Sequence, residues 1–266
     1  MKRKYIIPGK ALILILILII GTIGCSRDEE KNEGVSKAGN MKNLGASAGD
    51  LLGDHNFTSL IIEAAYVPGH EPSAAALEEM KSFLNYYTHK PDGISIVKTA
   101  IDVPGNGPYS IAEVAEIEKK HRTYYNDGDQ LAVFIFFANG RSEAEEDDKV
   151  ILGTAYRNTS MVLFEETIRK MAASSALVSK NSITSTTLKH EFGHLFGLVD
   201  NGSPSQSDHM DASSRSHCNV SGCLMTATVE FGKGAIEYIK AQKSSTAYSH
   251  AFDEQCRADL RANGGK

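Results

Sequence analysis

The run His190-Glu191-Phe192-Gly193-His194 constrains this chain more than any other feature of its sequence. On an α-helix, residues four apart lie about 40° apart on one face, so both imidazoles can reach a single metal ion. Glu191 is displaced by about 100°, where its carboxylate can reach a water molecule on that ion. The pattern therefore predicts a metal site on a helix over residues 182–198. Apolar residues around it would pack this helix into a core: Leu188, Phe192, Leu195 and Phe196.

A glycine three residues after His194 extends the pattern. Gly197 can adopt a positive φ, which would end the helix and turn the chain back. Asp200 follows three residues later, so the whole reads HExxHxxGxxD. Its joint occurrence by chance has a probability of roughly 1 in 1000 or below. A pair of histidines that merely pack in a helical core is therefore the weaker interpretation.

This pattern resembles the signature of the metzincin metallopeptidases, which usually have a third histidine ligand at the position of Asp200. A pattern with aspartate at this position resembles that of the snapalysin branch of the family. Further along, residues 217–225 read HCNVSGCLM, and the spacing Cys-x₄-Cys-x-Met resembles that of the archaemetzincins. The resemblance implies that Met225 forms the Met-turn, a soft apolar floor below the metal. The alternative for Met225 is an ordinary core methionine.

Three residues are candidates for the third metal ligand. In archaemetzincins the third histidine and the first cysteine closely follow the glycine, whereas seventeen polar, turn-rich residues intervene here, at 201–217. His209 and His217 both lie within that segment. Spacing favours Asp200, which is the first choice, and aspartate is an accepted zinc ligand. Because imidazole is the commoner zinc ligand in such sites, the residue type favours the two histidines as the third ligand. The adjacent cysteine at 218 favours His217.

Three of the four cysteines lie in the C-terminal part of the chain: Cys218, Cys223 and Cys256. Archaemetzincins use two cysteine pairs for a second, structural zinc. The resemblance implies a mixed site here, with Asp253 in the place of the missing cysteine. In an exported protein a disulfide is the favoured alternative, and a Cys218–Cys223 bond would close a short loop. Cys256 would then be a core residue of the last helix or the partner of either cysteine.

The N-terminus has the organisation of a bacterial export signal. Basic residues at 2–4 precede the apolar run ALILILILII at 11–20, and ten helical residues span only about 15 Å, half of a bilayer core. The sequence TIGC at 22–25 resembles a lipobox, which implies cleavage after residue 24 and acyl chains such as palmitate on Cys25. The acidic run at 28–30 resembles surface-export signals of Bacteroidetes lipoproteins. An ordinary signal peptide or an uncleaved anchor is the alternative.

Charge and composition exclude several kinds of partner. The 266 residues carry a formal charge of −5, and cleavage before Cys25 would leave 24 basic and 33 acidic residues, a charge of −9. Nucleic acid is therefore an unfavourable partner, and so is direct adhesion to anionic lipid. We expect a monomer that the N-terminal lipid holds at the bacterial cell envelope, on the outer membrane or cell surface.

The chain divides into a signal peptide at 1–24, a flexible tether at 25–55 and one metallopeptidase domain at 56–266. The predicted class is α+β (α/β-like), with a mixed twisted sheet and packed helices in the N-terminal half and a mostly irregular and helical C-terminal half. Hydrophobic patterns predict strands at 59–67, 93–101, 131–138, 150–156 and 160–166, and helices at 72–89, 110–125 and 182–198. One or two helices are expected after residue 199.

The favoured function is a zinc-dependent endopeptidase for peptide or protein substrates. Zn²⁺ would polarise a water molecule, while Glu191 takes its proton as general base and passes it to the leaving amine. In metzincins the substrate lies along an edge strand of the sheet, and residues 150–156 are similar in position to that strand. One alternative is a surface binding or adhesion module with a structural zinc, which would not need Glu191. Another is a zinc hydrolase for a non-protein substrate of the envelope.

Overall fold

The computed structural model describes residues 36–146, 149–230, 233–242 and 251–266. The predicted signal peptide and the lipidation site Cys25 lie outside the described residues. Within these ranges, no helix combines the length and the apolar character that crossing a membrane requires.

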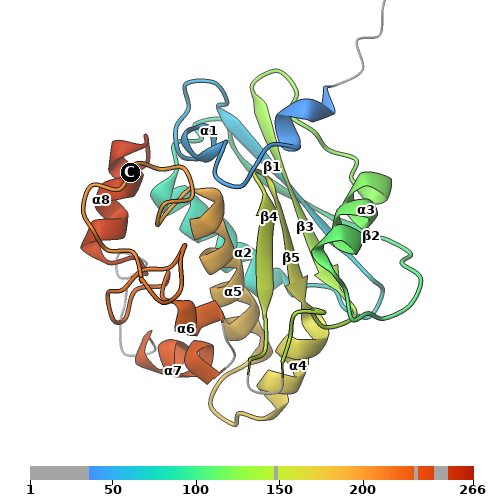
Figure 1. Ribbon diagram of the computed structural model, residues 1–266. Coiled ribbons are helices and arrows are strands. Elements are labelled where there is room, and N and C mark those ends of the chain that lie inside the picture. Colours follow the sequence, from blue (N-terminus) through green and yellow to red (C-terminus); the bar gives the residue numbers. More distant parts are fainter. Residues whose placement is uncertain (1–35, 147–148, 231–232, 243–250) are drawn as a thin grey trace, which may run out of the picture. The chain divides into compact units, whose positions relative to one another are not determined.

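Five strands form one mixed sheet in the order β2-β1-β3-β5-β4 (Figure 1). The central strand β1 (Ser59–Tyr66) pairs in parallel with β2 (Gly93–Ala100) and with β3 (Gln130–Ala138). Next to β3 lies the parallel strand β5 (Ser160–Phe164), followed by β4 (Gly153–Arg157), which is antiparallel and forms an edge. All five strands were predicted. The strand β3 is buried at every position after its first, as expected for a continuous apolar run.

Helices cover both faces of this sheet (Figure 1). On one face α2 (Ala74–Tyr87) packs against α5 (Lys180–Leu195), and on the other lies α3 (Ile111–His121). The predicted α+β class is therefore confirmed. The helix α4 (Glu165–Ala173) was not predicted, and the strand expected at 160–166 ends two residues early, where Glu165 and Glu166 begin this helix. The remaining helices are η1 (Lys37–Asn40), α1 (Ala48–Leu52), α6 (Ala227–Glu230), α7 (Lys233–Gln242) and α8 (Glu254–Ala262).

Three of the long helices begin at a serine cap. Ser73 accepts a hydrogen bond from the Ala76 amide at the start of α2, and Ser179 does the same for α5. At the start of α3, Ser110 and Glu113 form a reciprocal capping box. These caps satisfy backbone donors that the first helical turn leaves without partners, which fixes where each helix begins.

The flexible tether predicted at 25–55 is wrong for its described part. The compact unit of the chain starts at Val35, and residues 36–55 belong to it. Leu51 and Leu52 are fully buried in the same core as β1 and β3. The segment is polar and rich in glycine on average, but two buried leucines and one buried asparagine decide its structure.

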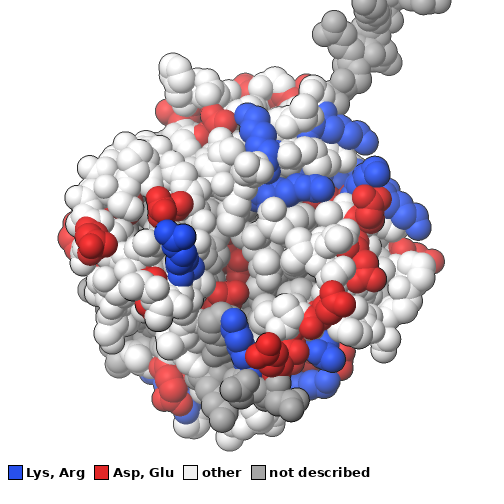
Figure 2. Space-filling view, viewed as in Figure 1, with Lys and Arg blue, Asp and Glu red and all other residues white. Residues whose placement is uncertain are grey.

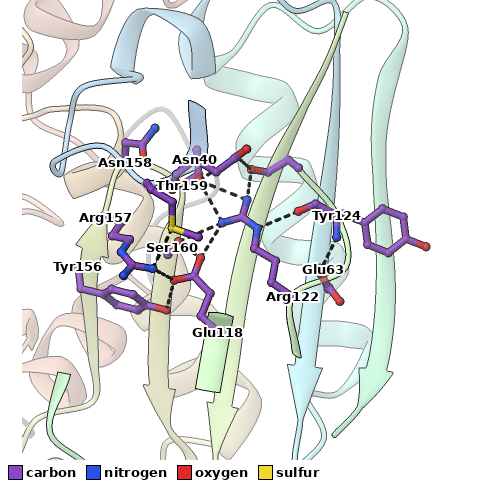
Figure 3. A network of polar contacts seen from close by, with 12 residues as sticks. Asn40, Glu63, Glu118, Arg122, Tyr124, Tyr156, Arg157, Asn158, Thr159 and Ser160 are labelled. Carbon is purple, nitrogen blue, oxygen red and sulfur yellow. Dashed lines mark hydrogen bonds and ion pairs between the residues drawn. The ribbon is translucent and has the colours of Figure 1, made fainter. Parts of the chain in front are cut away.

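That asparagine, Asn40, fastens the N-terminal segment to the sheet (Figure 3). Its side-chain amide donates to the Ala132 carbonyl at 2.9 Å and to Asn126 Oδ1 at 2.7 Å. It also donates to Thr159 Oγ1 at 3.1 Å, and its own Oδ1 accepts from the Asn126 amide at 2.9 Å. Since Asn40 is completely buried, these bonds replace all of its contacts with water.

A buried ion pair continues this network towards β4. Glu118 and Arg122 lie 2.7 Å apart with both side chains fully buried. Glu118 also accepts hydrogen bonds from Arg157 at 2.7 Å, Ser160 at 2.6 Å and Tyr156 at 3.0 Å (Figure 3). Burying a charge is costly unless its hydrogen bonds are made, and here they are made by the two strands β4 and β5. The network therefore fixes α3 against these strands.

We predict that Asn40→Ala lowers the free energy of unfolding by about 1–3 kcal/mol, because it leaves buried partners without hydrogen bonds. The control is Asn43→Ala, which removes an exposed side chain three residues away and should change stability by less than about 0.5 kcal/mol. Urea denaturation of both variants measures the difference. Equal stabilities would show that the segment is not held by Asn40.

Candidate active site

The helix α5 is buried over most of its length although it is rich in polar residues. Twelve of its sixteen residues are buried, the pattern from His190 to His194 among them. The helix ends at Leu195, and Gly197 has a φ of 74°, which confirms the predicted turn. The neighbours of α5 are the edge strand β4 on one side and α2 on the other.

His190, His194 and His217 converge in one group. The Nε2 atoms of His190 and His194 lie 3.1 Å apart, and the ligand nitrogens of all three residues lie within 4.8 Å of one another. The His217 ring centroid is 5.5 Å from that of His190 and 5.2 Å from that of His194. Tetrahedral zinc with its usual bond lengths holds imidazole nitrogens roughly 3.3 Å apart. The donor set and its spacing fit such an ion.

Each of the three imidazole rings is held by a polar contact at Nδ1, and in His217 the other nitrogen, Nε2, lies 2.8 Å from Glu230 Oε2. The contacts are the Leu224 carbonyl for His190 (2.7 Å), the Asn201 side-chain amide for His194 (3.2 Å) and the Arg215 carbonyl for His217 (3.1 Å). Outer contacts of this kind orient metal ligands. Neither Leu224 nor Asn201 was predicted, because nothing in their residue type marks such a role.

Burial keeps the two helix histidines neutral. It lowers the pKa of His190 to about 4 and holds that of His194 well below its usual range. Only the neutral imidazole can bind a metal. Both residues are therefore in their binding form at neutral pH.

Glu191 is buried beside the histidines and contacts the edge strand. Its Oε2 accepts a hydrogen bond from the Ala155 amide of β4 at 2.7 Å, while Oε1 has no partner among the described residues. Burial raises the pKa of this carboxyl group well above its usual range, and the nearby Glu230 adds to the shift. The close approach needs a glycine on β4, since a Cβ atom at Gly153 would lie 3.0 Å from Oε1. Glu191 thus has one carboxylate oxygen anchored by the edge strand and one without a partner among the described residues.

The three candidates for the third ligand occupy different places. Asp200, the first choice from spacing, is exposed and does not belong to the histidine group. It lies in the turn after α5 with a φ of 68°, and the chain then leaves the site before returning at His217. His209 belongs to a second cluster. His217 is thus the candidate that the structure brings to the two helix histidines.

Met225, the candidate for the Met-turn, packs against α5. The side chain is fully buried against α5, so close that a Cβ atom added at Gly193 would lie 2.2 Å from its sulfur. Gly193 stands between the two helix histidines in sequence. The residue before Met225 is Leu224, whose carbonyl holds His190. The turn that contains these two residues therefore contacts both His190 and the α5 backbone next to it.

Cys218, Cys223 and Cys256 are buried free thiols, so the favoured disulfide is not formed. Instead, Cys218 and Cys256 form a second group of metal-ligating side chains with His209 and Asp253. The Sγ atoms of Cys223 and Cys256 are 3.7 Å apart. This is close to the separation of roughly 3.8 Å that two thiolates have on a tetrahedral zinc.

His209 is the member of this second group that the sequence assigned elsewhere. Its Nδ1 lies 3.4 Å from the Cys218 sulfur and 3.7 Å from the Cys256 sulfur. On the other side its Nε2 contacts the Asp259 carboxylate at 2.7 Å. A carboxylate behind a histidine is a common way to orient a metal ligand. Asp253 also lies near, at 3.2 Å from Cys218, but it caps the start of α8 as well.

A pocket of about 170 Å³ opens beside the histidine group. Its walls come from distant parts of the chain: Thr154 and Ala155 of β4, Glu191 and His194 of α5, Leu44 of the N-terminal segment, and Glu230 at the end of α6. Figure 2 shows acidic side chains in the hollow between the regions of β4 and α6, with basic side chains gathered above it. Leu44 and Glu230 were not predicted, since no local pattern places either residue at the site.

The comparisons with known proteins give a similarity in structure and none in sequence. No family model matches the sequence, and no curated protein does. Among solved structures, the chain is similar to the archaemetzincin from Methanopyrus kandleri, with a TM-score of 0.48 and 14% sequence identity. The match covers 77% of this chain and 96% of the archaemetzincin.

We predict that Gly193→Ala lowers the free energy of unfolding by about 1–3 kcal/mol, because the new methyl group overlaps the Met225 sulfur. The control is Gly49→Ala in α1, where an added Cβ would meet nothing closer than 3.6 Å. That change should be neutral or stabilising by up to about 1 kcal/mol. Thermal and urea denaturation distinguish them, and an unaffected Gly193→Ala variant would mean that Met225 does not press on the helix.

Proposed function

We propose that the protein is a zinc-dependent endopeptidase. The observation that carries the proposal is the convergence of His190, His194 and His217 next to the buried carboxyl group of Glu191. A structural metal site needs ligands only. A neighbouring glutamate with one oxygen anchored and the other without a partner is what peptide hydrolysis requires in addition.

The Nε2 atoms of the three histidines would hold the metal. When bound, zinc supplies Lewis-acid polarisation and lowers the pKa of a water molecule to about 7. Glu191 is kept in place by the Ala155 amide through Oε2. Its Oε1 would accept a proton from the attacking water and donate it to the nitrogen of the leaving amine.

The edge strand β4 would bind the substrate. Among the described strands it pairs only with β5, so its other edge, where the Ala155 amide donates to Glu191, faces α5. Thr154 and Ala155 line the pocket together with His194. An extended peptide that pairs with this edge would therefore carry its backbone past the histidines.

The second cluster would hold a structural zinc. Cys218, Cys223 and Cys256 with His209 would supply a Cys₃His donor set, in which Asp259 orients the histidine. Asp253, the predicted fourth ligand, would remain the cap of α8. This assignment takes His209 as a ligand in place of Asp253, which the resemblance to archaemetzincins implied.

A lipid on Cys25 would tether the domain to the cell envelope. The uninterrupted apolar run and the lipobox-like TIGC support this part of the proposal. The folded unit starts at Val35, so about ten residues would separate it from the lipid.

The metal content of the purified full chain tests both sites at once. We expect two zinc ions per chain by elemental analysis and one in His190→Ala, because the cysteine cluster is untouched. Cys256→Ala should lose the other ion. If the wild-type protein is folded and binds no zinc on titration, the proposed function is wrong.

The role of Glu191 is tested by Glu191→Ala. This variant should retain its zinc, since no ligand is removed, and lose casein hydrolysis by about a hundredfold or more. A chelator should abolish the wild-type activity. Unchanged turnover in Glu191→Ala would contradict the mechanism, and zinc-loaded wild-type protein that leaves casein and other proteins intact would favour a non-protein substrate or a binding module.

A further inference from the structure

Glu230 brings a second carboxylate into the pocket, and the proposed reaction does not use it. The residue ends α6, five positions after Met225. Its side chain is 18% exposed and lines the pocket with Glu191 and His194. A carboxylate this close to the reacting groups must influence which substrates enter.

The contact that Glu230 makes here is with His217. Its Oε2 lies 2.8 Å from Nε2 of that ring. Because Nδ1 of His217 is engaged with the Arg215 carbonyl, Nε2 is also the atom left for a metal. A metal on His217 Nε2 would therefore replace this contact, and the Glu230 carboxylate could then face a molecule bound in the pocket.

Glu230 is not placed as a further ligand of the same ion. The histidine group has all its ligand atoms within 4.8 Å of one another, and Glu230 does not belong to it. No ion pair joins Glu230 to a lysine or arginine among the described residues. At 18% exposure this carboxylate is a partly covered acceptor in the pocket wall, where a positively charged group of a bound molecule could reach it.

We infer that Glu230 selects substrates that place a positive charge next to the scissile bond. The inference rests on the proposed function, since the same pocket would hold the peptide. An ammonium or guanidinium group supplies the chemistry, either from a Lys or Arg side chain or from the free amine of a peptide N-terminus. The other walls suit the carbon stem of a basic side chain, because Leu44 and Ala155 are apolar.

The test uses zinc-loaded full chain in detergent and fluorogenic peptides that carry Lys, norleucine or Glu on either side of the scissile bond. We expect kcat/KM to be about tenfold or more higher for Lys than for norleucine, as for a charge-assisted contact. Glu230→Gln should remove this preference, and Glu230→Lys should reverse it in favour of Glu. Peptides with free and acetylated N-termini show whether the charge comes from the amine or from the side chain.

Two controls separate a local effect from a general one. Glu237→Gln removes the same charge from an exposed site on α7 whose side chain is 73% exposed, and it should keep the wild-type preference. The zinc content of Glu230→Gln should equal that of the wild type. Equilibrium binding of the same peptides to Glu191→Ala, with and without Glu230→Gln, gives a readout that does not depend on turnover.

The outcomes distinguish this inference from the proposed function. If peptides are cleaved without a preference for a positive charge, or if the preference survives Glu230→Gln, the role of Glu230 is overturned while the peptidase stands. If no peptide or protein is cleaved by the zinc-loaded wild type, the proposed function fails and this inference fails with it.

Discussion

The burial of α5 is the constraint on which the rest of the structure depends. The helix carries histidines, a glutamate, threonines and one serine into the interior, and each buried polar group needs a partner there. The partners come from the surrounding elements: the Ala155 amide for Glu191, the Leu224 carbonyl for His190 and the Glu79 carboxylate for Ser185. The edge strand, the turn before Met225 and α2 are thereby placed by the polar side chains of one helix.

The two candidate metal clusters share one short stretch of backbone. His217 belongs to the first cluster and the next residue, Cys218, to the second. The Cys218 amide also donates to the Met225 carbonyl at 2.7 Å, which closes the loop between them. Whatever holds the cysteines together therefore also holds the third histidine and the methionine below the site. This connection supports the structural role proposed for the second cluster.

The N-terminal segment completes the site from the opposite direction. Asn40 fixes it to the sheet, and Leu44 then reaches the pocket wall. At Gly45, with a φ of 74°, the segment runs so close to the turn after α5 that an added Cβ would lie 1.4 Å from the Asn201 carbonyl oxygen. Asn201 in turn contacts His194. A stretch with the composition of a linker is thus part of the wall that surrounds the histidines.

The sequence by itself determined the features that depend on neighbouring residues. Hydrophobic patterns and apolar runs specify the five strands. The spacing of four residues between His190 and His194 puts both rings on one face of a helix, whatever surrounds that helix. The glycine turn at 197 is equally local. Only the tertiary structure decided that His217 rather than Asp200 joins these rings, since a loop of irregular path separates them. The tertiary structure also decided three other features: the free cysteines, the attachment of the N-terminal segment by Asn40 and the position of the Glu230 carboxylate. Each depends on contacts between residues far apart in the chain, which local spacing does not encode.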